Sequence, residues 1–213
     1  LGLPYERQAV TMRCYLDVLD QVRTGRGLVE VENELFRIHN PLDIAEMAPM
    51  PILIAALGPV MLKLAGERTE GTSLWLADER TISSHVAPAI TKAAAAAGRP
   101  PPRILAGVPV CLCGDDEVDA AAERTNRLLS EAETSPNYAR LMEHGDARSI
   151  GDVLIAGSEV TMERRLRGFA SAGLTDLNAR VVALGHDRGE RLRSAERTRE
   201  FLASVAPGLK KDG

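Results

Sequence analysis

Apolar residues along the chain follow two patterns: unbroken runs and repeats at helical spacing. Ile52 to Leu57 is the clearest run, with no polar residue in it. A run without alternation is typical of a strand buried on both faces of a parallel sheet. Strands are predicted on this basis over residues 52–57, 72–77, 104–112 and 177–184.

Segments with apolar residues at helical spacing lie between and around these strands. Ser158 is a candidate N-cap for one of them, and Gly173 a candidate stop for the same helix. Near the start of the chain, residues 28–38 alternate and predict a hairpin turning near Asn33, followed by a loop over 40–50. Helices are predicted over residues 6–23, 60–66, 82–97, 115–129, 137–144, 158–172 and 191–205.

The order of these elements predicts the fold class. Strand followed by helix occurs four times, which indicates an α/β fold with a parallel sheet. A doubly wound sheet and part of a (β/α)8 barrel share this order, so both are open at this point. No linker or low-complexity tract divides residues 1–213, and we treat them as a single domain.

Composition narrows the class of partner. Apolar residues make up 45% and charged residues 26% of the 213 residues, the balance of a globular protein. The formal charge of −4 offers no basic field for nucleic acid, and no apolar run is long enough to span a membrane. Three cysteines are too few for a disulfide framework, so we expect a cytoplasmic protein.

The histidines, the two cysteines near residue 112 and the pair after the last strand are expected to have structural roles. The histidines lack metal-ligand spacing, so no metal site is expected. Cys111 and Cys113 share one face of a strand and are expected to be core residues. His186 and Asp187 follow the last strand and are expected to be a solvated loop pair.

The turn at Gly58 is the most informative chemical feature. A buried strand turns there into a helix, with Pro59 in the first helical turn. A glycine permits close approach of a ligand, and the N–H groups of a helix's first turn attract anions. The alternative is a tight turn that needs glycine for its geometry alone.

Several segments together resemble the luciferase-like monooxygenase superfamily, and most closely its branch of oxidoreductases that use the deazaflavin coenzyme F420. The central one is Ala55-Ala56-Leu57-Gly58-Pro59, followed by Leu64-Ala65-Gly66-Glu67 and Glu70-Gly71. The others are residues 5–7 and 12–16, a hairpin at 31–36, and residues 103–115, 172–176 and 185–187. The resemblance thus extends over essentially the whole chain.

The resemblance implies the C-terminal half of a bacterial luciferase-like TIM (β/α)8 barrel, so we expect the first four βα units to be missing from residues 1–213. It implies an oxidoreductase that transfers a hydride between F420 and an unknown small organic substrate. The alternatives are an FMN-dependent monooxygenase, or a truncated, non-catalytic half-barrel that acts only by association. Its unclosed sheet would favour a homo-oligomer.

The resemblance also implies where the cofactor would lie. Leu57, Gly58, Pro59 and Met61 would border its ring and side chain, and Trp75, Leu76 and Ala77 would lie beside it. Trp75 has two interpretations, an apolar wall next to a flat ring or a cap on the core. No catalytic acid or base is identified.

Overall fold

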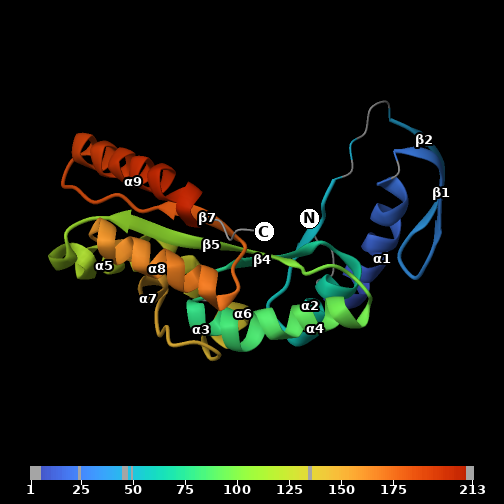
Figure 1. Ribbon diagram of the computed structural model, residues 1–213. Coiled ribbons are helices and arrows are strands. Elements are labelled where there is room, and N and C mark those ends of the chain that lie inside the picture. Colours follow the sequence, from blue (N-terminus) through green and yellow to red (C-terminus); the bar gives the residue numbers. More distant parts are fainter. Residues whose placement is uncertain (1–5, 24, 45–47, 49, 134–135, 210–213) are drawn as a thin grey trace.

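The computed structural model describes residues 6–23, 25–44, 48, 50–133 and 136–209. Figure 1 shows a crescent: a sheet lies in the middle, α9 (Arg188–Leu209) rises at one end, and an arm rises at the other. The arm consists of helix α1 (Gln8–Val22) and a hairpin of β1 (Arg26–Glu32) and β2 (Arg37–Asp43). The predicted first helix and hairpin are therefore confirmed.

The hairpin turn is built around Asn33. Its side-chain oxygen accepts hydrogen bonds from the N–H groups of Leu35 and Phe36, and its amide group donates to Asp17 of α1 at 3.1 Å. The predicted loop over 40–50 is partly wrong, because β2 continues to Asp43. Pro41 is tolerated within it because a two-stranded sheet consists of edge strands. Residues 45–47 and 49 lie outside the described residues.

The four predicted strands lie side by side, and every pair is parallel. They are β3 (Leu53–Ala55), β4 (Gly71–Trp75), β5 (Arg103–Leu112) and β7 (Asp176–Val181). A further short strand, β6 (Ile155–Gly157), pairs with the carboxyl end of β5 on the β4 side. This order confirms part of a barrel and excludes the doubly wound alternative.

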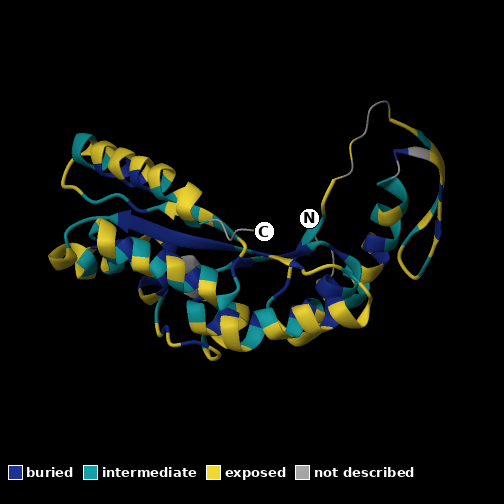
Figure 2. Ribbon diagram, viewed as in Figure 1, coloured by how far each residue is buried: buried dark blue, intermediate teal, exposed yellow. Residues whose placement is uncertain are grey.

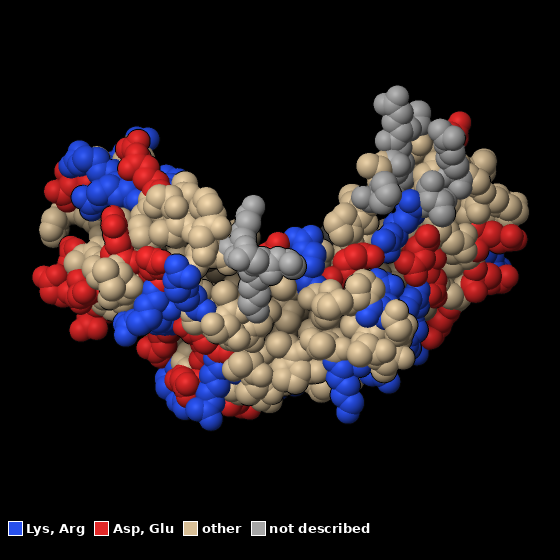
Figure 3. All heavy atoms as spheres, in the orientation of Figure 1, with Lys and Arg blue, Asp and Glu red and all other residues tan. Residues whose placement is uncertain are grey.

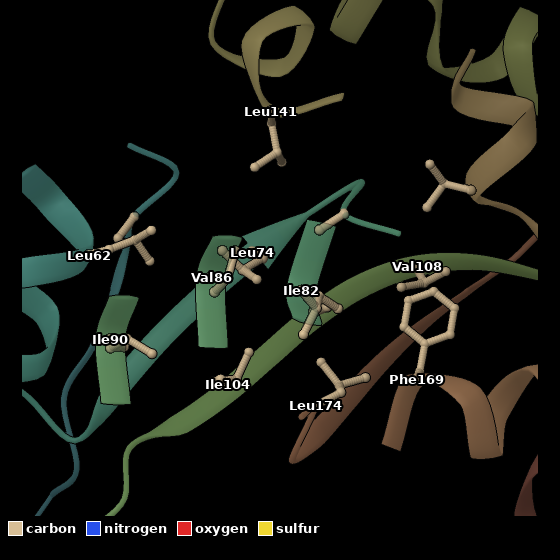
Figure 4. Close-up of a cluster of buried hydrophobic side chains, with 14 of the residues drawn as sticks. Leu62, Leu74, Ile82, Val86, Ile90, Ile104, Val108, Leu141, Phe169 and Leu174 are labelled. Carbon is tan, nitrogen blue, oxygen red and sulfur yellow. The ribbon is translucent and has the colours of Figure 1, made fainter. Parts of the chain in front are cut away.

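The helices after the strands lie on one face of the sheet. These are α2 (Pro59–Arg68), α3 (Glu79–Thr81), a π-helical turn η1 (Ile82–Val86), α4 (Ala87–Ala96) and α8 (Glu159–Ala172). In Figure 4, Leu74 of β4 and Ile104 and Val108 of β5 meet side chains of these helices, with Phe169 of α8 among them. Alternate strand positions supply this core because successive side chains point to opposite faces.

A long excursion separates β5 from β6. It contains a 3-10 turn η2 (Asp115–Glu117) and helices α5 (Val118–Glu133), α6 (Pro136–Met142) and α7 (Ile150–Val153). Neither α7 nor β6 is predicted from the sequence. Leu141 of α6 is 2% exposed and points into the main core, which holds the excursion against the barrel.

The opposite face of the sheet is the inner, concave face. Figure 2 shows β5 as a buried band, while residues of β3 and β7 on this face, such as Ala55, Asn178 and Arg180, are exposed. In Figure 3 the molecule is hollowed between α9 and the arm, and basic and acidic side chains are interspersed over the face shown. None of the helices in the described part of the chain has the length and apolarity of a membrane span.

Polar groups at the amino ends of the strands bind one another. Glu70, just before β4, accepts hydrogen bonds from the Ile52 N–H at 2.7 Å, from Arg23 at 2.9 Å and from Arg99 at 3.3 Å. Burial would raise the pKa of Glu70, but the hydrogen bonds from the Ile52 N–H and from Arg23 lower it below its ordinary value. Arg103 at the start of β5 binds both carboxylate oxygens of Asp176 at the start of β7, at 2.6 and 3.1 Å.

Candidate functional site

A hollow of about 870 Å³ opens at the carboxyl end of β3. Three parts of the chain enclose it: the loop from β3 into α2, the inner side of the arm, and α6. Most of its lining is apolar. It includes Met12, Tyr15, Phe36, Leu57, Met61 and Tyr138. We call this space the β3 hollow. Ligands of barrel folds bind at the carboxyl ends of the strands, which is where it lies.

Gly58 has no structural need to be glycine. Its φ of −96° and ψ of 163° are open to any residue, and an added Cβ would meet no atom within 4 Å. The tight-turn alternative raised by the sequence therefore does not explain this glycine. Gly58 lines the β3 hollow, and the space where a Cβ would stand is open.

The start of α2 also faces the hollow. Gly58 is the N-cap and Pro59 follows it, so the N–H groups of Val60 and Met61 are the first that the helix offers to a ligand. Both residues line the hollow, and the Val60 side chain is 61% exposed. The arrangement offers an apolar surface beside backbone donors at the positive end of a helix dipole.

Helix α6 and the loop after it form the opposite wall, which the sequence did not reveal. Tyr138, Arg140 and His144 line the hollow from this side. Burial raises the pKa of the Tyr138 hydroxyl, so it remains a proton donor near neutral pH. Their i, i+4 spacing would place Arg140 and His144 on one face of the helix predicted over 137–144, but nothing in the sequence indicates that this segment meets the β3 hollow, and in the structure α6 ends at Met142.

His85 joins the two walls. Its Nε2 donates a hydrogen bond to the Leu57 carbonyl oxygen at 2.9 Å, and its ring stacks on His144 with 3.9 Å between centroids and 4° between planes. The residue lies in the π-helical turn η1, a kind of turn that is frequent at functional sites. These two contacts of His85 fix the Leu57 carbonyl group relative to the loop that carries His144.

Trp75, Leu76 and Ala77 are not among the residues that line the β3 hollow. Trp75 lies over Gly107, where a Cβ would come within 2.3 Å of its ring, and the Arg180 guanidinium lies 5.8 Å from the ring centroid. Leu76 and Ala77 are buried, at 1% and 0% exposure. Of the seven residues predicted to contact the cofactor, four therefore line the β3 hollow and three do not.

The loop after β4 is held in place by a buried carboxylate. Asp78 accepts hydrogen bonds from the N–H groups of Thr81 at 2.7 Å, Asp146 at 2.7 Å and Ala147 at 2.9 Å. Burial would raise the pKa of Asp78, but the bonds from Thr81, Ala147 and Asp146 lower it. Leu76, just before it, has a φ of 59°, a strained backbone for a leucine.

Other candidates from the sequence have structural roles. Asp187 caps the start of α9 by accepting from the Glu190 N–H at 2.8 Å, and the His186 N–H donates to Glu190 at 2.7 Å. Cys111 is fully buried and Cys113 is half-buried. Among the residues whose placement is described, no cluster of three or more His, Cys, Asp or Glu could hold a metal ion.

A parallel sheet with helices on one face and a hollow at the carboxyl ends of its strands defines part of a (β/α)8 barrel. The sequence model described as luciferase-like monooxygenase matches residues 1–176. The chain belongs to this family. No curated protein sequence matches the chain significantly.

Solved structures share this fold. A coenzyme F420-dependent tetrahydromethanopterin reductase from Methanopyrus kandleri has a TM-score of 0.67 at 22% identity, over 95% of this chain and 64% of its own. An F420-dependent secondary alcohol dehydrogenase in complex with an F420–acetone adduct has a TM-score of 0.67 at 14% identity, over 99% of this chain and 64% of its own.

A flavin enzyme is similar to the same degree. The oxygenating constituent of 3,6-diketocamphane monooxygenase from Pseudomonas putida, in complex with FMN, has a TM-score of 0.66 at 17% identity, over 97% of this chain and 65% of its own. The chain therefore spans about 64% of the length of these proteins.

Proposed function

We propose that this chain is part of an oxidoreductase that uses coenzyme F420 to transfer a hydride to or from a small organic substrate. The observation that carries the proposal is Gly58: the fold does not require a glycine there, and the missing side chain leaves room in the β3 hollow. When bound, the deazaflavin supplies the hydride chemistry. F420-dependent structural neighbours support this choice.

The residues of the hollow fit the binding of a flat, partly anionic cofactor. Leu57, Pro59 and Met61 give it apolar contact, and the N–H groups at the start of α2 give it an anion site. His85 holds the Leu57 carbonyl in position, and Tyr138 and His144 line the opposite wall. Trp75 would act further along the inner face, and Leu76 and Ala77, which are buried, would support that part of the wall without contacting the substrate.

Fluorescence titration of F420 and FMN against the wild type and Gly58→Val tests the proposal. Because valine would occupy the hollow, we expect Gly58→Val to weaken F420 binding at least tenfold, about 1.4 kcal/mol, with an unchanged melting temperature. Gly208→Val is the matched control, since a Cβ there also meets open space but lies in α9. It should bind like the wild type.

Three outcomes would contradict the proposal. Equal F420 affinity of wild type and Gly58→Val would remove Gly58 from the site. Tighter binding of FMN than of F420 would favour the flavin-dependent monooxygenase, which the FMN-bound neighbour supports. Absence of binding by both cofactors would favour the non-catalytic half-barrel. Wild-type affinity is expected to be weak, because the chain spans about 64% of the F420-dependent neighbours.

We also propose that the chain forms a homo-oligomer. Within the described residues, β3 and β7 each have an edge without a partner strand, and the inner face exposes Ala55, Asn178 and Arg180. Unpaired strand edges favour association with another chain. Light scattering should give a mass at least twice the 22.9 kDa of one chain. A monodisperse, stable monomer would contradict this expectation.

A further inference from the structure

By strand alternation, three charged side chains of the main sheet belong to its inner face, and two of them form an ion pair. Arg103 and Asp176, at the amino ends of β5 and β7, are joined by hydrogen bonds of 2.6 and 3.1 Å. Arg180 is the third, because Asp176, Asn178 and Arg180 alternate with the residues of β7 that pack against the helices. Within the described strands, no opposite charge is left on this face to neutralise Arg180.

The strand register places Arg180 toward the carboxyl end of the inner face. Arg180 pairs with Pro109, whereas Asn178 pairs with Gly107, two residues nearer the amino ends. Gly107 in turn pairs with Trp75 of β4. Ligands of barrel folds bind at the carboxyl ends of the strands, so Arg180 and Trp75 lie on the side of the sheet from which a substrate approaches.

Gly107 lets Trp75 reach Arg180 across β5. A Cβ on Gly107 would stand 2.3 Å from the indole ring, so a larger residue there would displace the ring. The Arg180 guanidinium lies 5.8 Å from the ring centroid, within the range of a cation–π contact. Trp75 also packs against the cluster that contains Leu129 and Ile150, which fixes the position of the ring.

The contact with Trp75 leaves the hydrogen-bonding groups of Arg180 unused. A guanidinium has five N–H donors, and a cation–π contact requires none of them. Among the described residues, none accepts a hydrogen bond from Arg180, and the residue is exposed. Asn178 is exposed too, and its amide group likewise has no partner in the described part of the chain. The planar fork of a guanidinium matches the oxygen atoms of a carboxylate or a phosphate.

We propose that Arg180 binds a carboxylate or phosphate group of the substrate, which makes the substrate a small organic anion. That the anion is a substrate rests on the hydride transfer proposed above. Trp75 contacts the apolar part next to the anionic group, and the Asn178 amide donates a further hydrogen bond. Strands β4 and β5 separate Arg180 on β7 from the start of α2 after β3, so the anionic groups of substrate and cofactor bind at different places.

The fluorescence of Trp75, the single tryptophan of the sequence, reports directly on this site. The purified 213-residue protein is titrated with butyrate, with its uncharged analogue butyramide and with inorganic phosphate. Chloride keeps the ionic strength constant, because salt screens exposed charges. We expect a saturable change with butyrate, which should bind at least about tenfold more tightly than butyramide. Tighter binding of phosphate than of butyrate would identify the substrate's anionic group as a phosphate, and the reverse order as a carboxylate.

Variants of Arg180 separate its charge from its shape. Arg180→Gln removes the charge and should weaken butyrate binding at least about tenfold. Arg180→Lys keeps the charge but loses the planar fork, so we expect an intermediate affinity. Arg167→Gln is the matched control, because Arg167 is also exposed but lies on α8, which covers the other face of the sheet. It should bind butyrate like the wild type, and all three variants should keep the wild-type melting temperature.

Three outcomes would overturn the proposal: equal affinity for butyrate and butyramide, unchanged butyrate binding by Arg180→Gln, or no response to either anion. The titrations contain no F420, so they are independent of the test with Gly58→Val. If the anions bind at Arg180 but F420 does not bind, the anion site stands and the proposed cofactor is wrong. If F420 binds and the anions do not, the cofactor stands and the anion site is wrong.

Discussion

The two ends of the same parallel strands are built differently. At the amino ends, Glu70, Arg103 and Asp176 bind neighbouring side chains and backbone groups, and the chain packs closely around them. At the carboxyl end of β3, Gly58 faces open space and Val60 is 61% exposed. At the amino ends, polar groups bind one another and the closely packed chain stabilises the fold. At the carboxyl end of β3, exposed groups are available to a ligand. Barrel folds typically use their two ends in this way.

The same substitution at two glycines should separate the two ends most strongly. A Cβ on Gly71, at the amino end of β4, would lie 2.0 Å from the Arg103 carbonyl oxygen, and backbone cannot move aside as a side chain can. We expect Gly71→Ala to lower the free energy of unfolding by about 4 kcal/mol. Gly58→Ala should change it by less than about 1 kcal/mol. Urea titration measures both, and equal losses would refute the contrast.

Variants of Asp78 test whether the carboxyl end of β4 is as open as the carboxyl end of β3. Asp78→Ala should cost about 3 kcal/mol, because three buried N–H groups lose their acceptor. Asp78→Asn should cost less, since one oxygen still accepts. A structural carboxylate at this end would limit the open region to the neighbourhood of the β3 hollow. A loss below 1 kcal/mol in the alanine variant would show that the loop is not held by this residue.

The pH dependence of Asp78 has a definite sign. Its pKa is lower in the folded protein than in the unfolded chain, so its contribution to stability is present above the unfolded pKa. That contribution is lost as the pH falls below about 4 and through the folded pKa. Unfolding experiments between neutral and acidic pH should show a steeper decline for the wild type than for Asp78→Asn. Parallel curves would contradict the assignment.

The smallest effect is expected at the Arg103–Asp176 pair. Its geometry is bidentate, but the side chains are 44% and 32% exposed, so water competes with the bond. A double-mutant cycle with Arg103→Ala and Asp176→Ala should give a coupling energy below about 1 kcal/mol that declines as salt is added. A larger, salt-independent coupling would mean that the amino ends depend on charge more than on packing.

The sequence predicted those parts of the molecule that depend on local pattern. Apolar runs located four of the five strands described in the sheet, and the Gly58-Pro59 turn located one wall of the β3 hollow. The other wall could not be found this way. Helix α6 reaches the hollow because Leu141 packs into a core made by strands far away in the sequence. The contact of His85 with Leu57 likewise depends on the tertiary fold, and no spacing in the sequence predicts it.

Strand β6 illustrates the same limit. Ile155, Ala156 and Gly157 are too few to form a recognisable run, and they become a strand only because the end of β5 offers them a partner. The division of the seven predicted cofactor residues has a similar origin. Trp75 lies on the face opposite to Leu74, and its distance from the β3 hollow depends on how the sheet curves.

Strands β4 and β6 pair with the same edge of β5, and a gap separates them along it. Pairing with β4 ends at Gly107 and pairing with β6 begins at Val110, so in the described chain Val108 and Pro109 have no strand beside them on that edge. Arg103 N–H and the Gly107 carbonyl bind toward β4, which places the position of Pro109 on the same side. A proline has no N–H to leave unpaired there. Strands β4 and β6 can therefore share one edge of β5 without meeting each other, because the residue at the gap between them has no N–H that needs a partner strand.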